Sequence, residues 1–411
     1  MPEFLTLLSP TEALTRWLPA FGETVCESEE IETILALGRV TSRPVVADRP
    51  LPDFPRSTMD GYAVRAVDTF GASDGLPAYI ALAGEVPMGG QPVFALDPGQ
   101  AALIHTGGML PENADAVVML EYTQPARPGE VEILRAVAPA ENVIRVGEDV
   151  QTGQIVIPAG VRLRPAEIGG LAALGFQKIQ VTRQPRIAII SSGDEIVPLE
   201  ATPLPGQVRD INSHTLSALI EEKGGLPLRF GIMPDDVGAL RKALDRALDE
   251  TDAVIITAGS SASIRDMTAQ VIQQSGAPGV IVHGINVRPG KPTILAVCDL
   301  KPVVGLPGNP VSALVIAGLF VTPMLERLLG LQRPRVQAQV TARLSLNIAS
   351  QAGREDWIPV TLSADADDFL ADPIFFKSNL IFNLVRADGL LYIPADSTGL
   401  TAGENVRIYL L

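Results

Sequence analysis

The turn SSGDE (191–195) places two carboxylates side by side directly after an apolar run. Gly193 permits a tight turn, so that Asp194 and Glu195 stand at its crest. Two adjacent acids in this position could bind a divalent cation or orient a ligand hydroxyl. A solvated turn with an Asp cap gives the same pattern, so the turn alone leaves both interpretations open.

The segment TAGSSASIRD (257–266) combines small residues with an acid. Small residues such as Gly259 and Ser261 let backbone amides approach a phosphate closely, and a helix N-terminus adds a favourable field. Asp266 suits Mg²⁺ there, because this cation binds carboxylates and phosphate oxygens together. A helix start with Asp in its first turn explains the segment equally well.

Two cations in VRPGKP (287–292) are suited to an anionic ligand. Arg288 and Lys291 flank a Pro–Gly turn, three residues apart. Guanidinium and ammonium groups at a loop bind phosphate and other oxyanions. The segment therefore predicts a phosphate or oxyanion contact.

LPGNPVS (306–312) is the sharpest local signal in the chain. Asn309 is placed to cap a helix and Pro310 to occupy its first position. Gly308 would bring the backbone close to a ligand. A well-built helix start without a ligand remains the alternative.

Three segments of the amino-terminal half also combine polar residues with glycine. Each of them alone fits an ordinary turn. They are RSTMDGYAV (56–64), HTGGMLP (105–111) and RVGEDV (145–150).

The elements that must position these segments change in type at Arg186. From there, continuously apolar runs alternate with helical patterns, which is typical of a doubly wound parallel sheet. Ligands bind beyond the carboxyl ends of such strands. The predicted strands are 186–190, 227–233, 252–257 and 301–306, and the predicted helices are 211–220, 237–248, 266–274 and 310–329.

The flanking regions are predicted to be rich in strands. The first ~180 residues contain short strand-like pieces bounded by turn residues, and the segment from about Arg333 looks like a small all-β domain. In that last segment 375–398 and 403–411 are predicted strands. The pieces of the first region are strands at 79–83, 100–105, 116–120 and 131–134 and helices at 29–37 and 165–174.

Composition excludes several classes of protein. The chain has 411 residues, with 32 Lys and Arg against 47 Asp and Glu, which gives a formal charge of −15. This balance argues against a duplex nucleic-acid binder and a membrane-surface protein. The few cysteines and histidines form no zinc pattern, and the N-terminus is no signal peptide. The most apolar stretch, 311–325, falls short of the ~20 residues of a membrane span, so we expect a cytoplasmic protein.

Taken together, eight segments resemble the molybdopterin molybdenumtransferase family of MoeA-like proteins, which is similar to the carboxy-terminal domain of gephyrin. They stand in the family's order over nearly the whole chain. The loop AGSSASIRDM departs from the family's GGVSVG followed by Asp-Tyr, and Arg288 stands where the family has Lys. The segments are STMDGYAV, HTGGMLP, RVGEDV, SSGDE, MPDD (233–236), the Ser-rich loop ending in Asp266, RPGKP and LPGNPVS.

The resemblance implies a multi-domain α/β plus β subunit. Its centre would be a three-layer α/β molybdopterin-binding domain at 183–326, with an N-terminal helix at 1–21 packed on it. An irregular β-containing domain would be formed by 22–49 and 141–182. A β domain would be inserted at 50–140, and a β barrel would follow at 327–411.

The implied reaction is insertion of molybdenum from molybdate into adenylylated molybdopterin, with Mg²⁺-dependent release of AMP. The family forms homodimers with a cleft shared between subunits, and molybdopterin adenylyltransferase is an expected transient partner. Asp60 and Thr106 would close the cleft of the other subunit. The implied catalytic residues are Asp60, Asp194, Glu195, Asp235 and Asp266, and the implied metal ligands are Asp194, Glu195 and Asp266. The implied substrate contacts are Thr106, Gly193, Gly259, Ser261, Arg288, Lys291, Pro307, Gly308, Asn309, Pro310, Ser312, Arg354 and Ser378.

Three hypotheses remain open at this stage. The leading one is an enzyme that inserts molybdenum, or tungsten in a relative. The second is a carrier or scaffold that binds molybdopterin without catalysis. The third is a Mg²⁺-dependent nucleotide hydrolase that inserts no metal. AMP release that depends on the oxyanion distinguishes the first from the other two.

Overall fold

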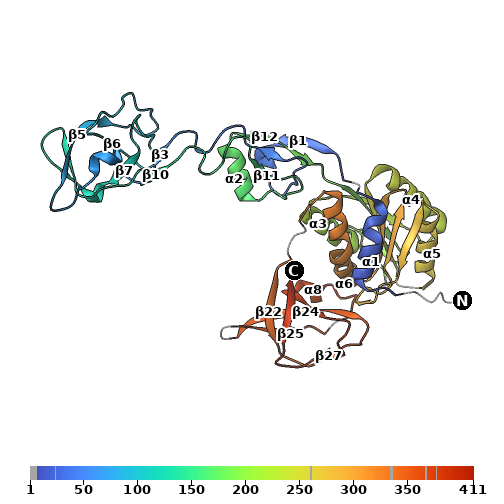
Figure 1. Cartoon of the computed structure of the whole chain (residues 1–411). Coiled ribbons are helices and arrows are strands. Elements are labelled where there is room, and N and C mark those ends of the chain that lie inside the picture. The colour runs from blue at the N-terminus through green and yellow to red at the C-terminus, as the bar shows by residue number, and fades with distance from the viewer. Residues whose placement is uncertain (1–6, 24, 260–261, 334–336, 366–367, 376) are drawn as a thin grey trace.

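The computed structural model describes residues 7–23, 25–259, 262–333, 337–365, 368–375 and 377–411. The described chain is elongated (Figure 1). A β-rich part lies at one end, an α/β part and a β barrel lie at the other, and a small β-containing part joins them.

The α/β part is built on a six-stranded sheet of order β16-β13-β17-β21-β20-β18. The four predicted strands are mutually parallel, as expected. The sheet is nevertheless mixed, because β20 and β18 add to it antiparallel. Only Asp299 and Leu300 connect β20 to β21, and so short a connection joins antiparallel strands alone. The strands are β13 (Arg186–Ser192), β16 (Leu226–Met233), β17 (Ala253–Ala258), β18 (Pro278–His283), β20 (Ile294–Cys298) and β21 (Lys301–Pro307).

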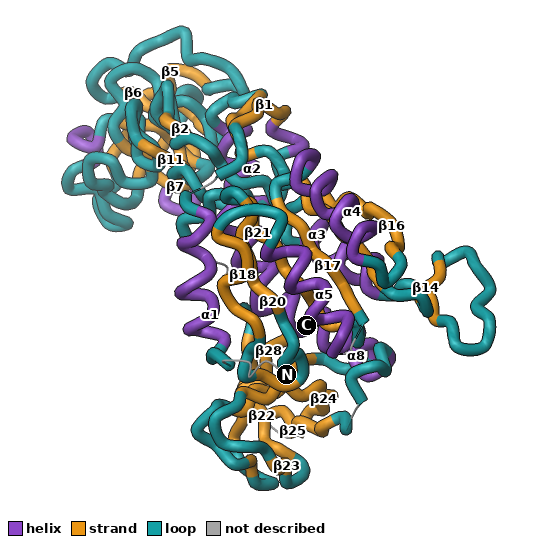
Figure 2. The backbone as a smooth tube through the Cα atoms, turned by 90° about the vertical axis from the view of Figure 1, so that its right-hand side faces the viewer, coloured by secondary structure: helices purple, strands orange, loops and turns teal. Residues whose placement is uncertain are grey.

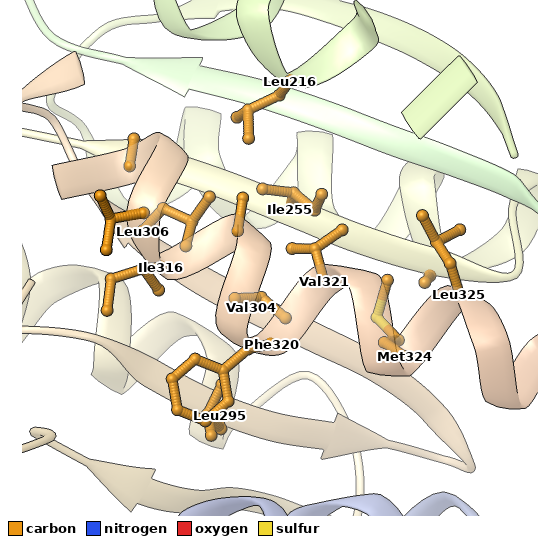
Figure 3. Packing of buried hydrophobic residues seen from close by; sticks show 14 of the residues in the cluster. Leu216, Ile255, Leu295, Val304, Leu306, Ile316, Phe320, Val321, Met324 and Leu325 are labelled. Carbon is orange, nitrogen blue, oxygen red and sulfur yellow. The ribbon is translucent and has the colours of Figure 1, made fainter. Parts of the chain in front are cut away.

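Helices cover both faces of this sheet, which gives three layers. Alternate residues of a strand point to opposite faces, so Ile255 packs toward Leu216 and Phe320, whereas Ile256 packs toward Leu240. Figure 3 shows the first of these interfaces. The helices are α1 (Pro10–Trp17), α3 (Asn212–Glu222), α4 (Val237–Glu250), α5 (Ala262–Gln273), α6 (Pro310–Ile316) and α7 (Thr322–Leu328), with a π-helical segment, Ala317–Val321, between the last two.

The continuous helical stretch Pro310–Leu328 is long and apolar. The most apolar window of this 19-residue helix has a mean hydropathy of 1.6, so that the helix is long and apolar enough to cross a membrane by length and composition alone. The helix is longer than the predicted apolar stretch 311–325, which by itself is shorter than a membrane span. Because 61% of its most apolar window is buried and its side chains pack on the sheet, it is a core helix of the α/β part.

The β-rich part at the far end contains a sheet of order β7-β4-β6-β5-β9-β8. All four strands predicted in this region are present. Its core includes Val64, Ile80 and Val118. The strands are β4 (Gly61–Val64), β5 (Ala78–Glu85), β6 (Gln100–Ile104), β7 (Ala116–Met119), β8 (Thr123–Pro125) and β9 (Glu130–Ile133).

The joining part consists of short strand pairs and one helix. The helix predicted at 165–174 is confirmed as α2 (Pro165–Ala173), but the helix predicted at 29–37 is wrong. Its first part forms β1 (Ser28–Glu32), which pairs with β12 over five residues, because tertiary pairing outweighs its helix-like apolar spacing. Its second part contains only the short 3-10 helix Thr33–Leu35. The strands of this part are β1 with β12 (Lys178–Thr182) and β2 (Val45–Val46) with β11 (Ile155–Ile157). The pair β3 (Arg56–Ser57) and β10 (Val143–Ile144) lies against the β-rich part (Figure 1).

The terminal part is a closed barrel, since β24 pairs with both β25 and β26 in the order β24-β25-β22-β28-β26. β19 (Val287–Arg288) of the α/β part adds to β24 in parallel. The strand predicted at 375–398 is wrong in part, because it contains the helix α8 (Phe382–Val385); a short apolar run does not reveal its own period. The barrel strands are β22 (Gln339–Leu344), β24 (Glu355–Asp365), β25 (Asp368–Pro373), β26 (Gly389–Ile393) and β28 (Asn405–Leu410), with the pair β23 (Ile348–Ala349) and β27 (Gly399–Leu400).

Candidate functional site

The loops that follow the parallel strands meet at one edge of the α/β sheet. The register pairs Ser192 with Met233, Ser191 with Thr257 and Ala258 with Pro307. The predicted segments after β13, β16, β17 and β21 therefore begin side by side. A further pair, β14 (Ile196–Val197) and β15 (Val208–Arg209), carries a loop away from this edge (Figure 2).

Two of the predicted acidic residues are hydrogen-bonded to each other at this edge. The Asp235 amide donates to Oδ1 of Asp194 at 3.2 Å, and the Ser192 hydroxyl donates to Oδ1 of Asp235 at 3.0 Å. Gly193, between Ser192 and Asp194, has a φ of +157°. A Cβ added to Gly193 would lie 2.8 Å from Oε2 of Glu195. Asp194 and Glu195 are exposed, so both carboxylates can meet a ligand from solvent. The turn after β13 and the turn after β16 thus form one acidic unit.

Asp266 lies on the fifth residue of α5 and is exposed. Among the described residues, no three His, Cys, Asp or Glu side chains form a group that could hold a metal ion by themselves. Mg²⁺ is usually bound through one or two carboxylates together with substrate phosphates and water. Asp194 and Asp235 would supply two carboxylates of such a partial site, and the metal roles of Asp194, Glu195 and Asp266 stay predictions. Ser261 lies outside the described residues.

A pocket opens between the loop after β17, helix α5 and strand β21. It contains two of the predicted contacts, Gly259 and Pro307, and two residues that sequence reasoning missed, Arg265 and Thr268. Arg265 directly precedes Asp266, which was the only available signal. The lining residues are Ala258, Gly259, Arg265, Thr268, Pro292, Ile294, Gly305, Leu306 and Pro307.

The loop after β21 differs from its prediction in one respect. Pro310 occupies the first turn of α6 as expected, but the Asn309 side chain makes no cap bond. It donates instead to the Ser378 hydroxyl at 3.0 Å, and the Val311 amide donates to the Ser378 carbonyl at 3.1 Å. Ser312, the third residue of α6, is buried. Asn309 and Ser378 are therefore brought together, although they lie far apart in the sequence.

Gly308 brings the backbone close to protein atoms. A Cβ added there would lie 2.8 Å from the carbonyl oxygen of Ala258, so the loops after β17 and β21 touch. Its own carbonyl accepts a hydrogen bond from Asn212 Nδ2 at 2.8 Å. A side chain at this position would force the two loops apart.

Sequence reasoning missed a buried carboxylate behind this loop. Asp210 accepts hydrogen bonds from the Ser191 hydroxyl at 2.7 Å and the Ser213 amide at 3.0 Å. It thereby fixes the start of α3, which carries Asn212. An acid followed by Asn and Ser at a predicted helix start is a capping pattern that could have revealed it.

The predicted cations occupy different environments. Arg288 and Lys291 are exposed, whereas the Arg354 side chain is largely buried. Arg354 is paired with the carboxylate of Asp356 through Nε at 2.7 Å and Nη2 at 3.0 Å. The exposed cations are therefore the ones available to an incoming anion.

Asp60 and Thr106 lie together in the β-rich part, away from the loops described above (Figure 1). Oδ1 of Asp60 accepts from the Thr106 amide at 2.7 Å and from the Thr106 hydroxyl at 3.1 Å. These hydrogen bonds lower the pKa of Asp60, with a smaller effect from His105 in the same direction. Within one chain, this pair is not brought to the edge of the α/β sheet.

Sequence models of three known regions match consecutive parts of the chain. The model of the MoeA N-terminal region (domain I and II) matches residues 8–175. That of a probable molybdopterin binding domain matches 188–327. The model of the MoeA C-terminal region (domain IV) matches 341–411.

Individual proteins are similar over almost the full length. A putative molybdopterin biosynthesis protein of Methanocaldococcus jannaschii is 37% identical over 93% of this chain and 92% of its own length. The molybdopterin molybdenumtransferase of a Nostoc species is 34% identical over 94% of this chain and 89% of its own. The crystal structure of a molybdopterin biosynthesis MoeA protein from Pyrococcus horikoshii OT3 superposes with a TM-score of 0.85, at 31% identity, over 99% of this chain and 100% of that one.

Proposed function

Because the chain belongs to the MoeA family of molybdopterin molybdenumtransferases, we propose that it inserts molybdenum from molybdate into adenylylated molybdopterin and releases AMP. Enzymes of this family are transferases of molybdenum cofactor biosynthesis. The observation that carries the proposal is the meeting of the acidic unit, the Gly259 loop and the Gly308 loop at one sheet edge.

In this proposal each group of residues has its own task. Asp194 and Asp235, with Glu195 and Asp266, bind Mg²⁺ together with phosphate oxygens of the substrate. When bound, the cation neutralises charge that develops on the phosphate bridge. The loops around Gly259 and Gly308 offer backbone and small side chains to the pterin phosphate.

The anionic ends of the substrates meet the cations of the site. Arg288 and Lys291 bind phosphate or molybdate oxygens, which suits the exposure of both side chains. The carboxamide of Asn309, in the loop after β21, and the hydroxyl of Ser378, to which it donates, add two polar groups to this site. This division of tasks separates a metal end from an oxyanion end.

The proposal includes a homodimer in the cytoplasm. Asp60 and Thr106 would then close the cleft of the partner subunit. This role accounts for a hydrogen-bonded polar pair in the β-rich part, at the end of the molecule opposite the α/β part. The enzyme that adenylylates molybdopterin must deliver a reactive product, so molybdopterin adenylyltransferase is the proposed transient partner.

The experiment combines purified protein, adenylylated molybdopterin, Mg²⁺ and either molybdate or tungstate. We expect AMP release and active cofactor that depend on both metal and oxyanion. Binding without AMP release would favour a carrier, and AMP release without an oxyanion would favour a hydrolase. The Asp266→Asn variant should fold normally and lose turnover; full activity would remove Asp266 from the catalytic residues.

A further inference from the structure

A fully buried carboxylate lies at the joint between the α/β part and the barrel. The side chain of Asp356, at the start of β24, has no exposed surface. Arg354 donates to both of its oxygens, and the Ser350 hydroxyl donates to Oδ2 at 3.0 Å. A buried carboxylate is costly unless it is paired and hydrogen-bonded in this way.

A second arginine reaches the same carboxylate from the α/β part. β19 pairs with β24 so that Arg288 stands opposite Asp356 in the register. Nη1 of Arg288 lies 3.8 Å from Oδ2 of Asp356. The backbone on either side is tied down as well, because the Glu355 amide donates to the Asn286 carbonyl at 3.1 Å. The cationic turn is therefore attached to the barrel at a defined position.

The two arginines differ in what they can still bind. The Arg354 side chain is 23% exposed, and its Nε and Nη2 are occupied by Asp356. The Arg288 side chain is 59% exposed and touches Asp356 only at the limit of an ion pair. Two guanidinium groups against one carboxylate leave one positive charge, which is presented by Arg288.

We propose that Asp356 is a positioning residue, which holds Arg288 in the orientation that binds a tetrahedral oxyanion, either free molybdate or a phosphate group. The inference rests on the proposed function, in which Arg288 binds such an anion. Asp356 acts through Arg288 and Arg354 and is not itself a ligand. A fixed guanidinium loses less conformational freedom on binding than a free one.

The sign of the effect makes the proposal testable. Removal of a carboxylate next to an anion site would tighten anion binding if its charge were its only influence. Removal of a positioning group weakens the binding instead, because Arg288 becomes free to adopt other orientations. Asp356→Asn keeps the shape and removes the charge, and it therefore separates the two effects.

The experiment is calorimetric titration of the full-length protein with molybdate and, separately, with inorganic phosphate. We expect the Kd of the Asp356→Asn variant to rise about tenfold for the preferred anion. The control Asp368→Asn removes an exposed carboxylate of the same barrel and should leave the Kd unchanged. In turnover, KM for that anion should rise by the same factor while kcat changes less. Unchanged or tighter binding by Asp356→Asn would overturn the proposal.

A milder variant protects the test against loss of folding. Ser350→Ala removes one hydrogen bond to Asp356 and keeps both arginines. We expect it to weaken anion binding in the same direction by a smaller factor, and wild-type affinity in a folded Ser350→Ala protein would count against the proposal. If the wild-type protein binds neither anion, the oxyanion part of the proposed function fails; if it binds and only the variants behave otherwise, the positioning role fails alone.

Discussion

Nδ2 of Asn309 donates a hydrogen bond to the hydroxyl of Ser378 at 3.0 Å, which joins the loop after β21 to the loop before α8. The Val311 amide adds a second bond to the same residue at 3.1 Å. Asn309 occupies the N-cap position of α6 without capping it by its side chain. The contact therefore links the α/β part to the terminal part right beside the candidate site.

This contact predicts an energetic coupling between the two residues. Asn309→Ala and Ser378→Ala should each lower kcat/KM for adenylylated molybdopterin, and the double variant should lose less than the sum of both. A coupling of about 1 kcal/mol corresponds to one net hydrogen bond. The measurement is a double-mutant cycle, with hydrogen exchange of the Val311 amide as a probe of the loop. Strict additivity with unchanged exchange would mean that the contact has no role.

A side chain added at Gly308 should displace the loop after β21, and Gly318 provides the control. An added Cβ would lie 2.8 Å from the Ala258 carbonyl oxygen, so Gly308→Ala should push the loops apart, with a cost of about 1–3 kcal/mol and a raised KM. At Gly318, inside the helical stretch that follows, an added Cβ meets nothing within 4 Å. Gly318→Ala should therefore be neutral or stabilise by up to about 1 kcal/mol. Thermal unfolding and steady-state kinetics of the two variants decide the matter, and equal behaviour would contradict it.

The strands of the α/β sheet could be predicted because their apolar runs and turn residues are local signals. β1 could not, since its helix-like spacing is overruled by pairing with β12, which is more than a hundred residues away. The two antiparallel strands β18 and β20 were not predicted, for a similar reason. Register and strand direction depend on the connections and partners and not on composition.

The residues of the candidate site that stand in loops could be named from the sequence. The buried residues that hold these loops in place could not. Asp194 and the Gly308 loop stood out through glycine, proline and adjacent acids. Asp356 did not, because nothing in the local sequence tells that its carboxylate is buried and paired, and the capping pattern around Asp210 does not tell that this carboxylate is buried. The contact between Arg288 and Asp356 joins positions 68 residues apart.

Stability should fall at low pH through one partly buried ion pair. Arg183 donates to both oxygens of Asp252, at 2.7 and 2.8 Å, and the Arg186 amide donates at 2.7 Å. Burial by itself raises the pKa of Asp252, but these hydrogen bonds outweigh it and lower the pKa below the ordinary 3.8. The stabilisation is therefore fully present above the unfolded-state pKa and is lost as the pH falls through the folded-state pKa.

The Asp252→Asn variant isolates this contribution. At pH 7 its free energy of unfolding should be about 2 kcal/mol lower than that of the wild type. The difference should shrink below about pH 4, where the wild-type carboxylate becomes protonated. Asp249→Asn, at an exposed position in the last turn of α4 shortly before Asp252, is the control. A difference in melting temperature that stays constant from pH 7 to pH 3 would refute the assignment.

The distance between Asp60 and the α/β loops within one chain predicts complementation between subunits. If the cleft is shared in a twofold dimer, Asp60→Asn and Asp266→Asn should each be inactive alone. A mixed dimer then contains one cleft with both original residues and one with both changes. Random exchange of subunits should restore about a quarter of the wild-type activity, and a mixed dimer isolated with two tags about half.

The mixed dimer also distinguishes the alternatives to a shared cleft. If Asp60 served a site within its own chain, no pairing of the two variants would restore turnover. If Asp60 had no role, Asp60→Asn would be active before mixing. Thr106→Val provides a finer probe, because it removes one of the two hydrogen bonds to Asp60. The bond from the Thr106 hydroxyl is lost, and the bond from the backbone amide, at 2.7 Å, is kept. Since both bonds lower the pKa of Asp60, its pKa should rise in this variant, which NMR titration of the carboxyl group can measure.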